Sequence, residues 1–244
     1  MVYITGDTHG NQVKWDEQIH GFLKSGDTIV VTGDFGVGFW GEKDRSEQMF
    51  YDFLAQQPYT VLFCDGNHEN FDKLNAYPVV PYCGGRVHGI RSNVMHLMRG
   101  EVYQIEGKSV FVFGGGYSLD QYRRRRGYDW WREEMPDDAE YRNASERLRQ
   151  HGNRVDCVIT HTAPAETVFA MSTMRELSIR EAAEERPLTT FLEYLRATVT
   201  YTHWYFGHFH IDRELWRNQT AVFDAIREME SGKLAKQWLP YEGG

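Results

Sequence analysis

The sequence predicts an α/β protein built around a largely parallel sheet. Five mostly apolar runs, at residues 2–5, 28–32, 61–64, 155–160 and 204–206, each end at a glycine or a polar residue, as buried parallel strands do. Helical periodicity follows the first two runs, and alternation of strand and helix is typical of parallel sheets with crossover helices. Because ligands bind at the carboxyl ends of such strands, the polar residues that follow these runs are the first candidates for a site, and we expect them along one sheet edge.

The composition favours one acidic globular domain spanning residues 1–244. The net charge of -8 and the pI near 5.7 argue against a general nucleic-acid or anionic-membrane binder, because those partners select basic surfaces. Three cysteines, an odd number, do not suggest a disulfide framework. The chain has no apolar run of about 18 residues that could span a membrane. It opens directly on a strand-like segment, so we expect a cytoplasmic protein.

Two helices are expected between the first three strands. The segment 11–24 carries an apolar stripe that a turn at 25–27 ends. A glycine-rich loop at 35–41 precedes a second helix, which runs to about residue 57 from a cap at Asp44 or Ser46. The residues expected on the buried faces are Val13, Trp15, Ile19, Phe22 and Leu23 in the first helix and Met49, Phe50, Phe53 and Leu54 in the second.

The second half of the chain mixes short β segments with helices. Segments 93–98, 101–105 and 109–113 are β-rich, and the last two form a hairpin around residues 107 and 108. Residues 117–150 are compositionally unusual and contain a helical piece at 136–148, so this region is interpreted as an inserted lid or cap. Two helical stretches lead to residue 198, and short β pieces at 214–216, 220–223 and 234–238 finish the chain.

The polar residues at the strand ends form a set suited to metal ions. They are Asp7, His9, Asp34, Asn67, His68, His161, His208 and His210. Mixed carboxylate, imidazole and amide ligands suit first-row divalent metals such as manganese, iron or zinc. Each short motif alone is more simply a loop, a cap or an exposed turn, but five of the ten histidines fall at these positions. The set is too large for one tetrahedral zinc ion and fits two metals that share a carboxylate.

The motifs Gly-Asp-x-His-Gly, Gly-Asp, Gly-Asn-His-Glu, Thr-His and Gly-His-x-His occur in this order between residues 6 and 210. Together they resemble the calcineurin-like metallophosphoesterase superfamily. The resemblance implies a four-layer αββα sandwich of two mixed sheets with a dinuclear site at the strand ends. It also implies residue roles: Asp7, His9 and His210 hold the first metal, Asn67, His161 and His208 hold the second, Asp34 bridges them, and His68 lies near the leaving group.

The function expected from this set is metal-dependent hydrolysis of phosphomonoesters or phosphodiesters. Water held between two divalent cations becomes acidic enough to attack phosphorus as hydroxide. His68 directly follows an expected ligand, so as imidazolium it could protonate the departing oxygen as a general acid. Manganese is favoured, with iron, zinc, nickel or cobalt as alternatives.

The residues after Asp34 differ from those of one branch of the superfamily. The protein Ser/Thr phosphatase branch has a second motif of the form Gly-Asp-x-Val-Asp-Arg-Gly, whose arginine grips phosphate, whereas residues 35–38 here read Phe-Gly-Val-Gly. A protein-phosphatase role is therefore not favoured, and the phosphate-gripping cation must come from elsewhere. Candidates in the 117–150 segment are Arg123, Arg124, Arg125 and Arg126 for phosphate and Tyr122, Tyr128, Trp130 and Trp131 for stacking on a base.

Other readings of these residues stay open. The four arginines could pair on a solvated surface with Glu133, Glu134, Asp137, Asp138 and Glu140, and the tryptophans could be local core. Asp65 is read as support for the site, Cys64 as core, and residues 114–116 as a glycine turn. If the insertion contacts a base, the enzyme is a nucleotide or cyclic-nucleotide phosphodiesterase. A non-catalytic interaction scaffold is the alternative outside enzymes. The sequence does not predict an oligomeric state.

Overall fold

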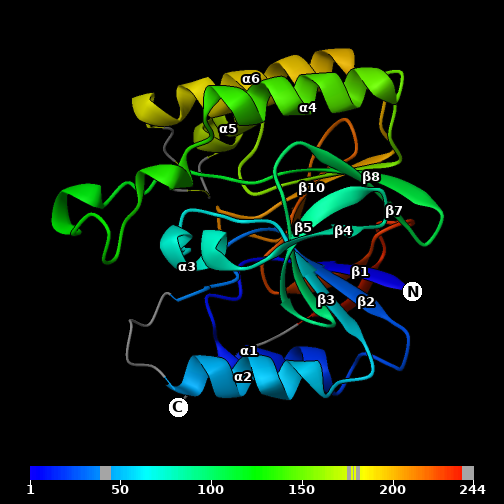
Figure 1. Ribbon diagram of the computed structural model, residues 1–244. Helices are drawn as coiled ribbons and strands as arrows, with labels where there is room; N and C mark the ends of the chain where they lie inside the picture. The colour runs from blue at the N-terminus through cyan, green and yellow to red at the C-terminus, as the bar shows by residue number, and fades with distance from the viewer. Residues whose placement is uncertain (39–44, 175–176, 178, 180–181, 238–244) are drawn as a thin grey trace.

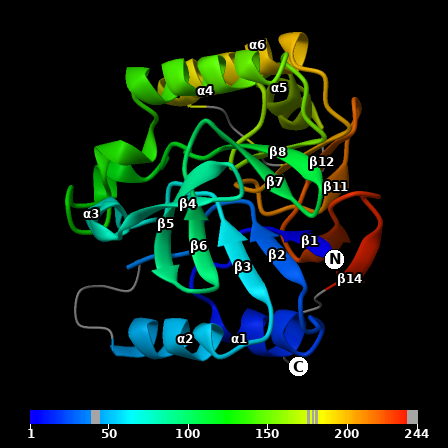
Figure 2. The ribbon, with the colours of Figure 1, turned by 45° about the vertical axis from the view of Figure 1, so that its right-hand side comes forward.

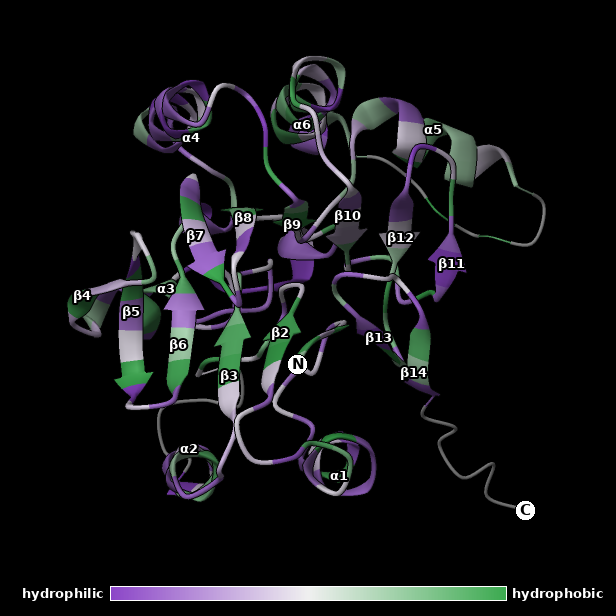
Figure 3. Ribbon diagram, turned by 90° about the vertical axis from the view of Figure 1, so that its right-hand side faces the viewer, coloured by the Kyte–Doolittle hydropathy of each residue, from purple (hydrophilic) through white to green (hydrophobic). Residues whose placement is uncertain are grey.

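The computed structural model describes residues 1–38, 45–174, 177, 179 and 182–237. Two mixed β-sheets pack face to face, and helices cover the outer side of each sheet (Figures 1 and 3). This arrangement is the four-layer αββα sandwich that the motifs imply, and it confirms the expected fold class. The expected cap at Asp44, the loop residues 39–41 and residue 238 lie outside the described residues. Among the helices that are described, none has the length and apolar composition needed to cross a membrane.

The larger sheet has eight strands, and β1, β2, β3 and β6 run parallel at its centre. The register of β2 places Val30 beside Ile4 of β1 and Leu62 of β3. In sheet order the strands are β14 (Leu234–Gln237), β13 (Ala225–Glu228), β1 (Val2–Thr5), β2 (Thr28–Val31), β3 (Thr60–Phe63), β6 (Val94–Leu97), β5 (Gly85–Arg91) and β4 (Val79–Tyr82).

The smaller sheet has six strands, and β8, β9, β10 and β12 are parallel. Its edges are antiparallel, with β7 pairing β8 and β11 pairing β12. In sheet order the strands are β11 (Arg213–Glu214), β12 (Gln219–Ala221), β10 (His203–Phe206), β9 (Cys157–Thr160), β8 (Lys108–Phe113) and β7 (Glu101–Ile105).

Helices from the two halves of the chain cover opposite sheets (Figures 2 and 3). The larger sheet packs against α1 (Gln12–Lys14), the π-helix Trp15–His20 that continues it, α2 (Arg45–Ala55) and α3 (Phe71–Ala76). The smaller sheet packs against α4 (Asp138–Gln150), α5 (Ala165–Thr173) and α6 (Arg186–Thr198). Short 3-10 turns lie at Gln121–Arg123, Arg132–Glu134 and Ala183–Glu185.

Strand β2 shows why the central strands are apolar at every position. Val30 lies in the core between the two sheets, whereas Ile29 and Val31 face the helices on the outer side. Successive side chains of a strand point to opposite faces, so a strand covered on both faces needs apolar residues throughout. All four residues of β2 are buried.

Several local expectations are corrected. In α2, Phe50 and Leu54 face the core as expected, but Met49 is 70% exposed and Tyr51 is buried in its place, because the stripe of the helix lies one position further on. Ser46 lies inside α2 and is not its cap.

Two further corrections concern turns and strands. The β7–β8 turn consists of Glu106 and Gly107, both with positive φ, and Lys108 already pairs in β8. Strands β4, β5 and β13 were not predicted.

The segment 117–150, expected as an inserted lid or cap, is not one structural unit. Helix α4, its C-terminal part, belongs to the outer layer of the sandwich, where Ala144 and Leu148 are buried beside Phe113 of β8. A capping box fixes its start, since Asp137 accepts from the Glu140 backbone and the Glu140 side chain accepts from the Asp137 backbone. The segment 117–137 is therefore the part that lies outside the layers.

Candidate metal centre

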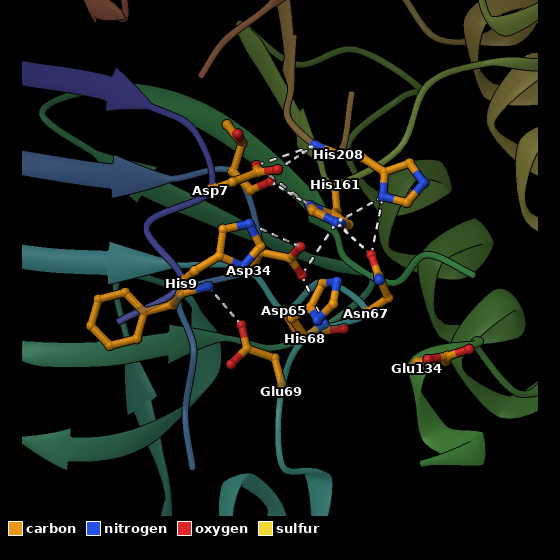
Figure 4. Close-up of polar contacts among 12 residues, drawn as sticks. Asp7, His9, Asp34, Asp65, Asn67, His68, Glu69, Glu134, His161 and His208 are labelled. Carbon is orange, nitrogen blue, oxygen red and sulfur yellow. Dashed lines mark hydrogen bonds and ion pairs between the residues drawn. The ribbon is translucent and has the colours of Figure 1, made fainter. Parts of the chain in front are cut away.

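The expected ligands come together, but from two sheets instead of one edge. Asp7, Asp34 and Asn67 follow β1, β2 and β3 of the larger sheet, whereas His161 and His208 follow β9 and β10 of the smaller one. The close-up shows these side chains converging at the strand ends (Figure 4). The single edge expected from the sequence is therefore wrong, and the site lies where the ends of both sheets meet.

Four residues form a first cluster of donor atoms. His9 Nε2 lies 3.1 Å from His210 Nε2, and His210 Nε2 lies 3.2 Å from Asp7 Oδ2. Asp34 Oδ2 is 3.8 Å from His9 Nε2. One donor atom from each residue lies within 4.8 Å of the other three, which is a geometry that can hold a metal ion.

A second cluster lies on the other side of Asp34. Asn67 Oδ1 is 3.1 Å from His161 Nε2 and 3.0 Å from His208 Nδ1, and the two ring nitrogens are 3.2 Å apart. Asp34 Oδ1 is 3.4 Å from His161 Nε2. Asp34 thus presents one carboxylate oxygen to each cluster.

Hydrogen bonds outside the second cluster orient its ligand atoms toward one another. His161 Nδ1 lies 2.9 Å from the Thr32 carbonyl, which can only accept, so Nδ1 carries a proton and Nε2 faces the cluster. Asn67 donates its amide to Ser118 Oγ at 3.1 Å, which turns its oxygen toward the cluster. Burial opposes protonation of His161, but Asp34 and Asp7 raise its pKa, so a metal ion would displace the proton on Nε2. The donor set therefore fits a divalent metal ion.

The charge states also suit metal binding. Burial opposes ionisation of Asp34, but nearby histidines, His161 foremost, hold its pKa below the usual range. Burial and the neighbouring His161 lower the pKa of His208 to about 3, so this ring is neutral. The pKa of Asp7 is also lowered, because the His210 hydrogen bond and His161 outweigh the effect of burial. Ionised carboxylates and a neutral imidazole are the forms that ligate metals.

A family model described as calcineurin-like phosphoesterase matches residues 1–212. The chain belongs to the calcineurin-like phosphoesterase family. The family is dinuclear and metal-dependent, and this chain has a candidate metal site formed by Asp7, His9, Asp34 and His210. A search of curated proteins finds no match. All eight residues singled out at the strand ends lie inside the matched range.

Several residues of the candidate site have positive φ angles. His9, Asp34, His208 and His210 have φ between 47° and 67°, four of the nine non-glycine residues with positive φ in the described chain. Such conformations are costly for side chains other than glycine and asparagine, and they persist where the surrounding structure holds them. Here the His9 N–H donates to the Asp34 carbonyl at 2.7 Å.

Glycines allow the motif loops of this chain to approach the candidate ligands closely. A Cβ on Gly66 would lie 2.1 Å from Asp34 Oδ1, and one on Gly207 would lie 2.1 Å from Asp7 Oδ1. A Cβ on Gly116 would be 3.0 Å from the His161 ring. The glycine turn at 114–116 therefore does lie beside the metal centre.

Glu69 supports the site and was given no role from the sequence. Its buried carboxylate accepts from the backbone N–H groups of Phe35, Gly36 and Val37, at 2.8, 3.0 and 2.6 Å. These contacts hold the loop that follows Asp34. The sequence signal for this role is the position of Glu69 in the Gly-Asn-His-Glu motif. An acid that is buried so close to an expected ligand needs hydrogen-bond donors around its carboxylate.

A second supporting group comes from the segment 117–137. Ser118 donates through Oγ and N to the buried carboxylate of Glu134, at 2.8 and 3.1 Å, while its Oγ accepts from Asn67. Because these contacts fix Ser118, they also fix which way the Asn67 amide points. No sequence pattern links Ser118 with Glu134.

Asp65 lies in a buried group of charged side chains. It accepts from Arg99 Nε at 2.8 Å and lies 3.0 Å from His96 Nε2, and all three side chains are buried. Its role as support for the site stays a prediction, whereas Cys64 is buried in the core between the sheets as expected.

His68 lies beside the two clusters. Its N–H donates to Asp34 Oδ1 at 2.8 Å, and its ring packs edge-on against His9 with ring centres 5.2 Å apart. Arg124 Nη1 is 3.3 Å from His68 Nδ1, and Asp120 holds the same guanidinium at 2.8 Å. Of the four consecutive arginines, Arg124 is the one that reaches the site.

The other residues of the expected substrate-binding set lie mostly at the surface of the loop. Arg123, Arg125, Arg126, Tyr122 and Tyr128 are exposed, and Trp130 is half-buried. Trp131 is buried in the core and donates to Asp72 at 2.8 Å, so the core reading is the correct one for this tryptophan.

Proposed function

We propose that this phosphoesterase hydrolyses phosphate monoesters or diesters with two divalent cations, of which manganese is favoured. The observation that carries the proposal is the placement of Asp34, which presents one carboxylate oxygen to each donor cluster. The assigned ligands are Asp7, His9 and His210 for one ion and Asn67, His161 and His208 for the other, with Asp34 shared. Bound cations supply an acidified water as the nucleophile and neutralise charge on the phosphate.

The protein's part is to hold the ligands and the substrate in register. The His68 N–H fixes Asp34, and the His208 N–H donates to both Asp7 oxygens at 3.0 and 3.2 Å. These backbone contacts pre-orient the carboxylates, so little reorganisation is needed when cations bind.

His68 is proposed as the general acid for the leaving oxygen. Burial lowers its pKa, so the free protein keeps this ring neutral near pH 7. A phosphate group bound beside the ring adds negative charge, which raises its pKa and favours the protonated ring. The protein can then deliver that proton to the departing oxygen.

Arg124 is proposed as the phosphate-gripping cation. It replaces in function the arginine that residues 35–38 lack, and Asp120 and the Asp129 carbonyl hold it, the latter at 3.1 Å from Nη1. A guanidinium oriented in this way is suited to bidentate contacts with phosphate oxygens.

The test is activity of metal-stripped protein reconstituted separately with manganese, iron, cobalt, nickel, zinc and magnesium. Substrates are p-nitrophenyl phosphate and bis-p-nitrophenyl phosphate, and the preferred one identifies a monoesterase or a diesterase. We expect turnover with manganese and two bound ions by elemental analysis. Protein that binds two ions and hydrolyses neither ester would contradict the hydrolase and favour a scaffold.

Substitution of the shared ligand tests the metal assignment. Asp34→Asn removes a charge that both clusters use, so we expect fewer than two bound ions and loss of turnover of about a hundredfold or more. Asp16→Asn, at an exposed position on the π-helix, is the matched control and should keep both. An unchanged metal content in Asp34→Asn would overturn the bridging assignment.

A further inference from the structure

The segment 117–130 displays aromatic rings and cations to solvent beside the candidate metal centre. Tyr122 is 78% exposed and Tyr128 is 61% exposed. Arg123, Arg125 and Arg126 are also exposed. In Figure 1 this segment is part of the green loop that projects from the side of the molecule ahead of α4. Its surface is a local exception in a chain with a net charge of -8.

This loop is held in place by its own hydrogen bonds. The Gly127 N–H donates to the Trp130 carbonyl at 2.7 Å, and the Asp129 carboxylate accepts from the Arg125 N–H. At its start, Ser118 is tied to the buried Glu134. The exposed side chains therefore project from a defined backbone.

The side chains of the loop point in two directions. Arg124 turns inward to His68, with 15% of its side chain exposed. On either side of it, the Arg123 guanidinium lies 5.1 Å from the Tyr122 ring centre and the Arg125 guanidinium lies 5.9 Å from the Tyr128 ring centre. A cation over one face of a ring leaves the rest of that ring open, as the exposures of both tyrosines show.

We propose that the exposed side chains of this loop bind single-stranded nucleic acid, with bases stacked on Tyr122 and Tyr128 and backbone phosphates paired with Arg123 and Arg125. Aromatic platforms interleaved with cations are the combination that single strands need, because every base has a face to stack and every linkage carries a charge. The inference rests on the proposed phosphoesterase function, since Arg124 would then hold one linkage of the strand at the metal centre.

The charge of the molecule limits the length of the strand. A net charge of -8 repels a polyanion away from the loop, so the contact covers a few nucleotides and depends strongly on salt. This is a local strand site and does not conflict with the absence of a general nucleic-acid surface expected from the composition. The substrate class that follows is a short single strand or the end of a longer one.

The test is binding of a fluorescent thymidine strand of about ten nucleotides to the full chain, measured by anisotropy in EDTA so that no hydrolysis occurs. Tyr122→Ala with Tyr128→Ala should weaken binding by about tenfold for each ring removed. Arg123→Ala with Arg125→Ala should weaken it and reduce the slope of log K against log salt by about 1.4, since each phosphate contact contributes about 0.7. Tyr194→Ala, at an exposed tyrosine on α6, is the matched control and should bind like the wild type.

The outcomes separate this inference from the hydrolase proposal. Absence of strand binding, or equal binding by wild type and the double tyrosine variant, overturns the strand site. If the same wild-type preparation hydrolyses bis-p-nitrophenyl phosphate with manganese, the hydrolase stands without it. Conversely, strand binding that the tyrosine pair controls supports the site even where the reconstituted protein hydrolyses neither nitrophenyl ester.

Discussion

At the scale of single residues, His68 contacts the Asp34 carboxylate, which lies between the two clusters, through its backbone N–H. His68→Asn should therefore keep both ions and lose turnover by about a hundredfold on an alkyl phosphate, whose leaving oxygen needs a proton. The loss on a p-nitrophenyl ester should be smaller, because nitrophenolate leaves without one. Steady-state kcat on both esters, with metal content, measures the difference.

The control for that prediction is His151→Asn, at an exposed histidine after α4. It should change neither rate. Equal losses of the His68 variant on the alkyl and the nitrophenyl ester would assign His68 to positioning and not to proton transfer.

Gly66 tests how tightly the loops close on the ligands. Gly66→Ala places a methyl group 2.1 Å from Asp34 Oδ1 and 2.6 Å from Asp34 N, and these atoms cannot move without disturbing both clusters. We expect a loss of about 2–4 kcal/mol in the free energy of unfolding and weaker metal binding. Urea unfolding of the metal-free protein and elemental analysis measure the two effects.

Gly21→Ala is the matched change outside the site. Nothing lies within 4 Å of its Cβ position and its φ is -74°, so alanine should leave the free energy of unfolding unchanged or raise it by about 0.4–1 kcal/mol. If Gly66→Ala unfolds at the same urea concentration as Gly21→Ala, the close approach is not a constraint.

At the scale of elements, the strands that carry ligands were predictable and several others were not. Val30 and its neighbours in β2 are buried on both faces, so their apolar run is visible in the sequence. Strand β4 contains Pro81 and β5 contains Gly89, and neither shows a continuous pattern. Strand β5 pairs with β6, and β4 pairs with β5, so both strands depend on neighbouring strands that their local sequence does not encode.

The turn after β8 is an element whose role depends on a distant segment. Ser118→Ala removes the acceptor of the Asn67 amide and leaves that buried donor unpaired, so Asn67 loses the contact that orients it. We expect the second ion to bind about 10–100-fold more weakly while the first is retained. Calorimetric titration of the metal-free protein with manganese resolves the two affinities.

Two further variants serve as comparisons for Ser118→Ala. Ser145→Ala, at an exposed serine of α4, should leave both affinities unchanged. Glu134→Gln keeps the shape of the carboxylate but weakens its hold on Ser118, so it should fall between the wild type and Ser118→Ala. Two unchanged affinities in Ser118→Ala would show that Asn67 does not depend on this support.

At the scale of the whole molecule, the motifs predict a ligand set whose side chains the structure brings together, but the apolar strand patterns alone do not predict the layers. Residue patterns put Asp7, Asp34 and His161 at strand ends, yet nothing in them assigns the first two to one sheet and the third to another. That division follows from which faces pack together in the core between the sheets, where Ile4 and Ile159 meet. For the same reason, the sequence did not show that α4, within the segment 117–150, packs on the smaller sheet. The single-domain organisation and the cytoplasmic location stay predictions from the sequence.

Because both sheets contribute ligands, metal binding should stabilise the sandwich as a unit. An ion that binds the folded chain but not the unfolded chain stabilises the folded state by about 2.7 kcal/mol at a concentration 100 times its Kd. For a chain of this length, each kcal/mol raises Tm by about 2–4 °C. We therefore expect Tm in manganese to exceed Tm in EDTA by roughly 5–10 °C per ion, and the increase to grow with manganese concentration.

Differential scanning calorimetry of wild type and Asp34→Asn measures this increase in Tm. The increase in the variant should be less than half of that in the wild type. A wild-type Tm that is the same in EDTA and in manganese would mean that the strand ends of the two sheets are not joined by metal.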